Sequence, residues 1–278
     1  MKNTQFIDEL SSRTKQIKSY ICVGLDSDFE KLPEIVKKNN SLEKAIYIFN
    51  KAIIDATSDI TSVYKLNNSF YAGYGIAGLK ALQKTNKYIK KNYPEIKIIA
   101  DCKHSEMKRS AELVAKEIYD ELLFDAFTVT PWFGFDTLEP FQSYQGKAVF
   151  VLCHDSNPSA GEVQDIKLAN GQFLYEHVTE LVCQRWNKSG NVLMECPLTY
   201  PKVLKKIVKL TPSDQFFLIA GLGAQGGDIS DLVVLKKHNF VVNASRSVIF
   251  ASSNKDFDQK SRDTVIDNNQ QISHLFTN

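Results

Sequence analysis

Ile98-Ile-Ala-Asp-Cys-Lys-His-Ser-Glu106 is an apolar run that ends in a group of charged residues. Asp101 ends the run, and Lys103 and Glu106 follow within the next five positions. A short apolar run is typical of a strand in a buried parallel sheet, and charged residues directly after such strands are how an α/β barrel builds its site. Alone, the stretch fits equally well a strand followed by the charged start of a helix, so the rest of the chain has to decide.

Runs of the same kind, rich in β-branched or aromatic residues, recur along the chain with helical segments between them. Between positions 42 and 53, for example, apolar residues recur every three to four positions after Asn40 or Ser41, either of which could cap a helix. This alternation predicts an α/β fold, a single (β/α)8 TIM barrel over residues 1–278, with a doubly wound open sheet as the alternative. The predicted strands are residues 20–25, 61–66, 96–100, 125–130, 148–153, 191–195, 215–220 and 240–244.

Composition and charge exclude several classes of protein. The 278 residues are 43% hydrophobic, and 34 basic residues nearly balance 32 acidic ones, so an electrostatic nucleic-acid binder is not expected. The first 18 residues are too polar for a signal peptide, and the absence of a long apolar run predicts a cytoplasmic protein without membrane contact. The five cysteines and five histidines lack metal-ligand spacing, which predicts buried reduced thiols and no metal site.

Polar residues at the ends of the predicted strands are the candidates for a site at the barrel mouth. One of them, Lys65, lies inside an apolar run, where a charge is costly to bury unless it is paired; Asp101 could supply the partner. The full set is Asp26, Lys65, Asp101, Lys103, Thr130, Ser156, Glu195, Gln225, Ser245 and Arg246.

A glycine-rich run after the seventh strand, residues 220–228, has backbone amides that could cradle an anion. Glycines of this kind often serve only tight turns. Arg246 after the eighth strand adds a forked, permanently charged donor, and loops 7 and 8 are where phosphate commonly sits in such barrels. Together the two loops favour a phosphate site over a simple turn.

These features together resemble the orotidine 5′-phosphate decarboxylase family, specifically its longer, bacterial-type branch. The most diagnostic motif is residues 101–106, which is similar to the family's D-x-K-x-x-D signature. The resemblance implies decarboxylation of orotidine 5′-phosphate to UMP in de novo pyrimidine synthesis, without a cofactor, by a homodimer with a shared active site. The other matching segments are residues 22–26, 64–71, 129–141, 156–158, 221–228 and 243–247.

The resemblance also implies roles for individual residues. Lys65, Asp101, Lys103 and Glu106 would form an alternating charged tetrad, with Glu106 supplied by the partner subunit and Lys103 protonating the carbanion. Asp26 would contact the ribose, Ser156 the pyrimidine edge, and Gln225 and Arg246 the phosphate. Ser110, which stands where the family has threonine, and Ser245 complete the candidate substrate-binding residues.

Several positions depart from the family pattern. Glu106 is one methylene longer than the family's aspartate, Ala220 stands in place of a proline, and residues 154–155 and 194–199 differ from the usual segments. Two alternatives therefore stay open. One is a homologue that binds a nucleotide monophosphate with little or no turnover, and the other is a related phosphosugar decarboxylase of the 3-keto-gulonate-phosphate type, whose members typically use magnesium.

Overall fold

The strands of the chain form one closed parallel barrel, in which each strand pairs with the next along the sequence and β8 pairs with β1. The computed structural model describes residues 2–223 and 226–277. Each strand lies within two residues of its predicted position, and the predicted TIM barrel is confirmed. The strands are β1 (Ile21–Gly24), β2 (Val63–Asn67), β3 (Lys97–Asp101), β4 (Ala126–Val129), β5 (Ala148–Leu152), β6 (Val192–Pro197), β7 (Phe216–Ala220) and β8 (Asn239–Ala244).

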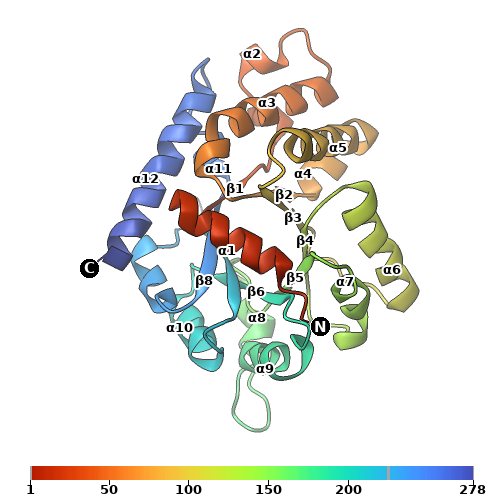
Figure 1. Cartoon of the computed structure of the whole chain (residues 1–278), viewed down its shortest axis with the longest axis vertical. Helices are drawn as coiled ribbons and strands as arrows, with labels where there is room; N and C mark the ends of the chain where they lie inside the picture. Colours follow the sequence, from red (N-terminus) through yellow and green to blue (C-terminus); the bar gives the residue numbers. More distant parts are fainter. Residues whose placement is uncertain (1, 224–225, 278) are drawn as a thin grey trace.

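Helices surround the barrel on its outside (Figure 1). The α-helices are α1 (Gln5–Ile17), α2 (Glu34–Lys37), α3 (Leu42–Thr57), α4 (Ser69–Ala72), α5 (Gly75–Asn92), α6 (Lys108–Lys116), α7 (Glu139–Gln142), α8 (Gly161–Gln164), α9 (Leu174–Leu181), α10 (Pro201–Leu210), α11 (Arg246–Ile249) and α12 (Phe257–Thr277). Short 3-10 segments are η1 (Phe29–Lys31), η2 (Ser58–Ile60), η4 (Phe135–Thr137) and η6 (Ile229–Leu235), and π-helical turns η3 (Glu117–Glu121) and η5 (Val182–Trp186) extend α6 and α9.

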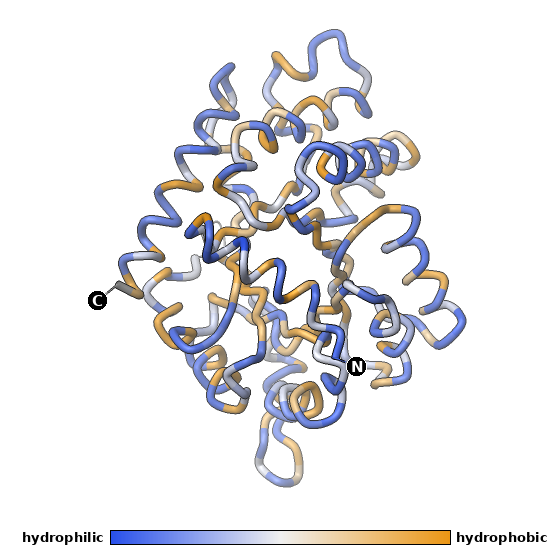
Figure 2. The backbone as a smooth tube through the Cα atoms, in the orientation of Figure 1, coloured by the Kyte–Doolittle hydropathy of each residue, from blue (hydrophilic) through white to orange (hydrophobic). Residues whose placement is uncertain are grey.

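The helix α3 shows how local sequence sets these elements. The Ser41 side chain caps its start by accepting a hydrogen bond from the Lys44 N–H group at 3.4 Å. On its predicted apolar face, Ile46, Phe49 and Ile53 are fully buried, whereas Leu42 and Ala52 are half-buried. Other helices likewise alternate between hydrophilic and hydrophobic positions along their length (Figure 2), as expected for helices with one buried face.

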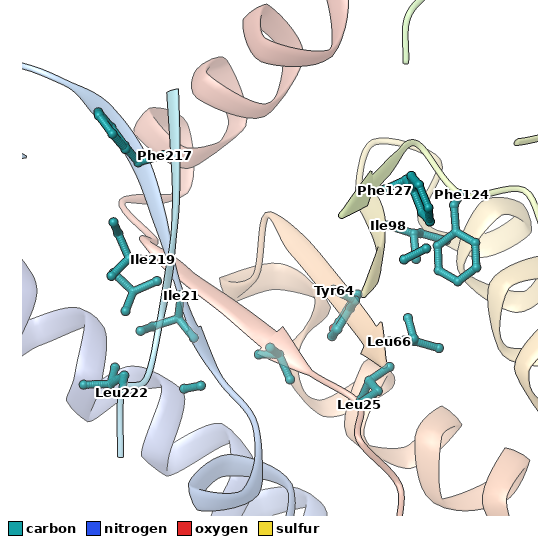
Figure 3. Close-up of a cluster of buried hydrophobic side chains, with 14 of the residues drawn as sticks. Ile21, Leu25, Tyr64, Leu66, Ile98, Phe124, Phe127, Phe217, Ile219 and Leu222 are labelled. Carbon is teal, nitrogen blue, oxygen red and sulfur yellow. The ribbon is translucent and has the colours of Figure 1, made fainter. Parts of the chain in front are cut away.

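The strands have two buried faces, each with its own apolar core. Outward-facing residues pack against the helices; Figure 3 shows Tyr64, Leu66, Ile98 and Phe127 of this outer core on neighbouring strands. The alternate residues point inward and form a second, smaller cluster inside the barrel, for example Val63. Because side chains alternate across a strand, these near-continuous apolar runs are the signature of strands covered on both sides.

The N-terminal helix α1 closes the end of the barrel at which the strands begin. It runs across the barrel in Figure 1, and its Phe6 and Leu10 pack into the inner cluster. Glu9 on the same helix forms an ion pair with Lys97 at the start of β3. With this end sealed, the interior opens at the carboxyl ends of the strands.

The C-terminal helix α12 docks against the outside of the barrel. Val265 and Ile272 are fully buried, and Asn269 accepts a hydrogen bond from the Tyr20 N–H group at 2.9 Å. Within residues 2–223 and 226–277, no helix combines the length and apolar character needed to cross a membrane. All five cysteines are free thiols; three of them are buried as predicted, whereas Cys102 and Cys183 are half-buried.

Candidate active site at the carboxyl ends of the strands

On β2, β3 and β6, a charged residue occupies the inward position that comes two residues after the apolar inner cluster. On β2, Val63 belongs to the apolar layer and Lys65 follows it, whereas on β3 Ile99 is followed by Asp101. Because the side-chain period of a strand is two, each pair points to the same side of the sheet at successive heights along the barrel. The strand sequences therefore place a layer of charge directly above a layer of hydrocarbon.

Lys65, Asp101 and Lys103, the last from the loop after β3, form a continuous ionic array. Lys65 Nζ lies 2.6 Å from Asp101 Oδ2, and Lys103 Nζ lies 2.7 Å from Asp101 Oδ1. Burial acts to raise the pKa of Asp101, but the two ammonium groups outweigh it and hold that pKa well below its ordinary range. Burial acts to lower the pKa of Lys65, and the Asp101 and Asp26 carboxylates raise it above its ordinary value. All three groups are thus charged at neutral pH.

Thr128 on β4 fixes the geometry of this array. Its Oγ1 accepts hydrogen bonds from the backbone N–H groups of residues 102 and 103, both at 3.0 Å. The same hydroxyl donates to Asp101 Oδ1 at 3.1 Å. Lys103 itself has a φ of 48°, in the left-handed region that non-glycine residues seldom adopt. The buried threonine stabilises this turn and aims the Lys103 side chain back over Asp101.

Glu195 on β6 is a further buried acid in the array. Only 1% of the residue is exposed, and its Oε1 lies 3.2 Å from Lys103 Nζ. Burial raises the pKa of Glu195 to about 6, against the opposing effect of Lys103. For Lys103, burial acts to lower the pKa, and the Glu195 and Asp101 carboxylates raise it above its ordinary value. The ammonium therefore contacts two carboxylates from different strands.

A cavity of about 330 Å³ lies above the array at the carboxyl ends of the strands. Asp26 on its wall accepts a hydrogen bond from the Asn67 N–H group at 3.3 Å. On another wall, Asp155 accepts a 2.7 Å hydrogen bond from the Ser156 N–H group. The cavity is lined by Asp26, Lys65, Asn67, Phe70, Asp101, Lys103, Asp155, Ser156, Glu195, Ala220, Gly221, Leu222, Asn243, Ser245 and Arg246.

The loops after β7 and β8 form the rim of this cavity. Gly223 has a φ of 81°, and a Cβ atom there would come within 2.5 Å of Ser247 Oγ, so the close approach of the two loops requires glycine. Among the ion pairs of the described residues, none involves Arg246, which leaves its exposed charge available to an anion. Gln225, the other predicted phosphate ligand, lies outside the described residues.

Two predicted site residues do not reach the cavity of their own chain. Glu106 is 43% exposed at its side chain and lies 3.4 Å from His104 Nε2. Ser110 is exposed on α6. Both lie in or just after the loop that follows β3, outside the cavity lining that contains Lys65, Asp101 and Lys103.

Sequence reasoning missed Thr128 and left Glu195 without a role. Thr130 was selected as the polar residue ending the fourth strand, but Thr128 holds the inward position, and Thr130 instead contacts Ser105 Oγ at 2.9 Å. Both positions can be predicted from the two-residue alternation of side chains along a strand. Counting two residues on from the apolar inner position of each strand reaches Thr128 from Ala126 and Glu195 from Leu193.

A parallel barrel with alternating charges and an exposed arginine at its open end defines a TIM barrel with an enzyme-type site at the usual face. The chain belongs to the orotidine 5′-phosphate decarboxylase / HUMPS family, whose model matches residues 19–256.

Individual relatives agree with this assignment over nearly the whole chain. An orotidine 5′-phosphate decarboxylase of Flavobacterium johnsoniae is 37% identical over 96% of this chain and 97% of its own. The structure of Leishmania donovani OMP decarboxylase matches with a TM-score of 0.77 at 26% identity, covering 95% of this chain and 98% of the other. Leishmania donovani UMP synthase matches with a TM-score of 0.80 at 28% identity, over 95% of this chain but 56% of that longer one.

Proposed function

We propose that this protein decarboxylates orotidine 5′-phosphate to UMP and carbon dioxide. The observation that carries the proposal is the array of buried Lys65 and Asp101 with half-buried Lys103, in which Asp101 lies 2.6 Å from Lys65 and 2.7 Å from Lys103 at the floor of the cavity. Family membership and the names of the relatives support the same reaction.

The array suits a reaction in which negative charge moves from a carboxylate to a carbon atom. Asp101 would face the substrate carboxylate and disfavour it in the ground state. As the bond to carbon dioxide breaks, its electron pair would remain on the pyrimidine carbon, and Lys103 would stabilise that carbanion and then transfer a proton to it. A charge pair about 4 Å apart is worth roughly 4 kcal/mol at an effective dielectric near 20, or about a thousandfold in rate.

The rest of the barrier reduction would come from the grip on the remote parts of the substrate. Arg246 and the glycine-rich loop after β7, with Gln225, are proposed to hold the phosphate. Asp26 is proposed to contact the ribose and Ser156 the pyrimidine edge, with Ser245 nearby. All of these except Gln225, which lies outside the described residues, line the same cavity as the array.

The proposed assembly is a homodimer with a shared site. Met107, Leu113, Trp132 and Phe133 are exposed and define an apolar surface, and Met107 directly follows Glu106 in the chain. Such a surface is typical of a protein interface. Leu113 lies on α6 and Met107 directly before it, whereas Trp132 and Phe133 precede η4, which packs beside α6. A second copy docked there would bring Glu106 and Ser110, which have no place in their own cavity, to the edge of the partner's cavity, where Glu106 would lie beside the array without being needed to complete it.

Sedimentation of a Leu113→Asp variant tests this assembly. We expect the wild type to sediment as a dimer and Leu113→Asp as a monomer, because a buried unpaired charge opposes association. Val233→Asp is the matched control, since Val233 is an equally exposed apolar residue on η6. A monomeric wild type, or the same loss in both variants, would count against this surface as the interface.

The activity is tested by following the absorbance of orotidine 5′-phosphate with purified protein. The wild type should consume the substrate, Lys103→Ala should not, and Lys84→Ala, in which a surface ion pair with Glu43 is removed, should match the wild type. Substrate that persists with the wild type would exclude the proposed reaction and favour a protein that only binds nucleotides. A cytoplasmic location and a place in de novo pyrimidine synthesis stay predictions.

A further inference from the structure

Glu195 is the least expected charge in the barrel. It lies on β6, two residues after Leu193 of the apolar inner cluster. The residues directly before and after it, Met194 and Cys196, are fully buried. Its Oε1 contacts Lys103 Nζ at 3.2 Å, and its Oε2 makes no hydrogen bond within the described part of the chain. A buried carboxylate is costly, and an apolar residue would fill this position at lower free energy. Stability alone does not account for an acid at this position.

We propose that Glu195 is a positioning residue for Lys103 and completes an alternating array, Lys65, Asp101, Lys103 and Glu195, within a single chain. The inference rests on the proposed decarboxylation and deepens it. The resemblance to the family implies that the fourth charge comes from Glu106 of a partner subunit. In this chain, β6 already supplies an acid to the same ammonium, so the array does not depend on a second subunit for its fourth member.

The role follows from the contacts of Lys103. A lysine ammonium is a point charge on a flexible stem, and one carboxylate leaves it free to swing about that contact. Asp101 and Glu195 approach it from β3 and β6, whose ends lie in different parts of the barrel wall. Two contacts fix the ammonium over the cavity floor, where it can hold a proton ready for the substrate carbon.

This arrangement should respond to pH. The charged groups that face Glu195 are Lys103 and Lys65, which favour its ionised form, and Asp101 and Asp155, which oppose it. Burial is the largest influence and raises the pKa of Glu195 to about 6. Above that pH the Glu195 carboxylate forms an ion pair with Lys103. Below it Glu195 is protonated and the ion pair is lost. The wild-type kcat should therefore fall on the acid side of about pH 6.

The first experiment compares pH profiles of kcat and KM for the wild type, Glu195→Gln, Glu195→Asp and Glu106→Gln. We expect Glu195→Gln to lower kcat at least about tenfold at pH 7.5, with KM changed less than about threefold, the pattern of a residue that acts on the chemical step. Glu195→Asp should recover part of the rate. The acid limb of kcat should be clearly weaker in Glu195→Gln than in the wild type and in Glu106→Gln; the substrate phosphate also titrates near pH 6, but its contribution is common to all four proteins.

The outcomes separate this inference from the proposed function. If the wild type turns over the substrate and Glu195→Gln keeps its kcat and acid limb, the inference is wrong and the function stands. A larger kcat loss in Glu106→Gln than in Glu195→Gln would also overturn it. If the wild type does not turn over the substrate, the proposed function fails, and the inference fails with it as a statement about catalysis.

The contact itself is tested without turnover by a double-mutant cycle in thermal unfolding. Lys103→Met, Glu195→Gln and the double variant are compared with the wild type at pH 7.5. A direct pair predicts that the Tm shift of the double variant departs from the sum of the single shifts by about 3 °C or more. Additive shifts would show that the two side chains do not interact and would overturn the inference.

Discussion

The two layers of the barrel interior differ in chemistry although the same strands build them. In the lower layer, which α1 seals, the inward residues include Ile99 and Leu193. In the upper layer, two residues further along the same strands, they are Asp101 and Glu195. The comparison shows that the apolar layer, which stabilises the barrel, and the charged layer, which forms the site, lie at different heights along the barrel axis. On β3 and β6, moving two positions along the strand replaces a packed apolar side chain with a buried acid.

The largest effect is expected where a charge in the upper layer is left without its partner. Asp101→Asn removes the carboxylate between Lys65 and Lys103, leaving the buried Lys65 ammonium without its ion-pair partner. We expect turnover to vanish and the free energy of unfolding to fall by about 3–5 kcal/mol. Denaturant unfolding measures this, with Asp59→Asn as the control: Asp59 pairs with Arg262 on the surface, where the loss should be below about 1 kcal/mol. Equal losses in the two variants would remove the distinction between buried and surface pairs.

The lower layer should affect stability alone. Leu193→Ala deletes a fully buried side chain from the inner cluster and is expected to cost about 3 kcal/mol of unfolding free energy. Its kcat, measured well below the melting temperature, should stay within about threefold of the wild type, because the array lies one layer above. If Leu193→Ala abolished turnover while the protein remained folded, the two layers could not be treated as independent.

The pH dependence of stability should show the cost of Glu195. A pKa that rises from 4.5 to about 6 on folding means that the folded protein prefers the protonated acid. Its contribution is fully present below pH 4.5 and is lost as pH rises through about 6, a change of about 2 kcal/mol. Across this range the wild type should lose that much relative to Glu195→Gln, measured by denaturant unfolding at each pH. Parallel curves for the two proteins would mean that Glu195 has an ordinary pKa.

A smaller effect on the array should come from its support on β4. Thr128→Val keeps the shape of the side chain and removes the hydroxyl that contacts Asp101 and two backbone N–H groups. We expect a stability cost of about 1–2 kcal/mol and a kcat about tenfold lower. Thr179→Val is the matched control, since Thr179 is equally buried and its hydroxyl donates to the Tyr175 carbonyl on α9, away from the array; it should lose stability and keep its kcat.

The smallest effect is expected at Glu106. Because this side chain is outside its own cavity and Lys103 already contacts two carboxylates, Glu106→Gln should change kcat by no more than about threefold. Mixing Lys103→Ala with Glu106→Gln gives a sharper measurement. Under this account the mixture has only the activity of its Glu106→Gln subunits, whereas activity above that level would show that an intact Glu106 from the partner matters.

Much of this comparison could be predicted from the sequence, because it depends on local patterns. Strand positions and the pairing of Lys65 with Asp101 follow from apolar runs and from the cost of burying a lone charge. Glu195 was identified as a strand-end residue, yet its contact with Lys103 joins β6 to β3, and which side chains meet across a barrel depends on its closure and register. Thr128 was missed because a hydroxyl at a buried position carries no charge signal.

The central claim is that Lys103, held in the charged layer, delivers a proton to the carbon that loses carbon dioxide. The direct test is to incubate orotidine 5′-phosphate with the wild type and with Lys103→Ala in deuterated water and to follow the products by NMR. The account predicts UMP carrying one deuterium at that carbon with the wild type and no UMP above background with Lys103→Ala. No UMP from the wild type, or UMP formed at a comparable rate by Lys103→Ala, would contradict it.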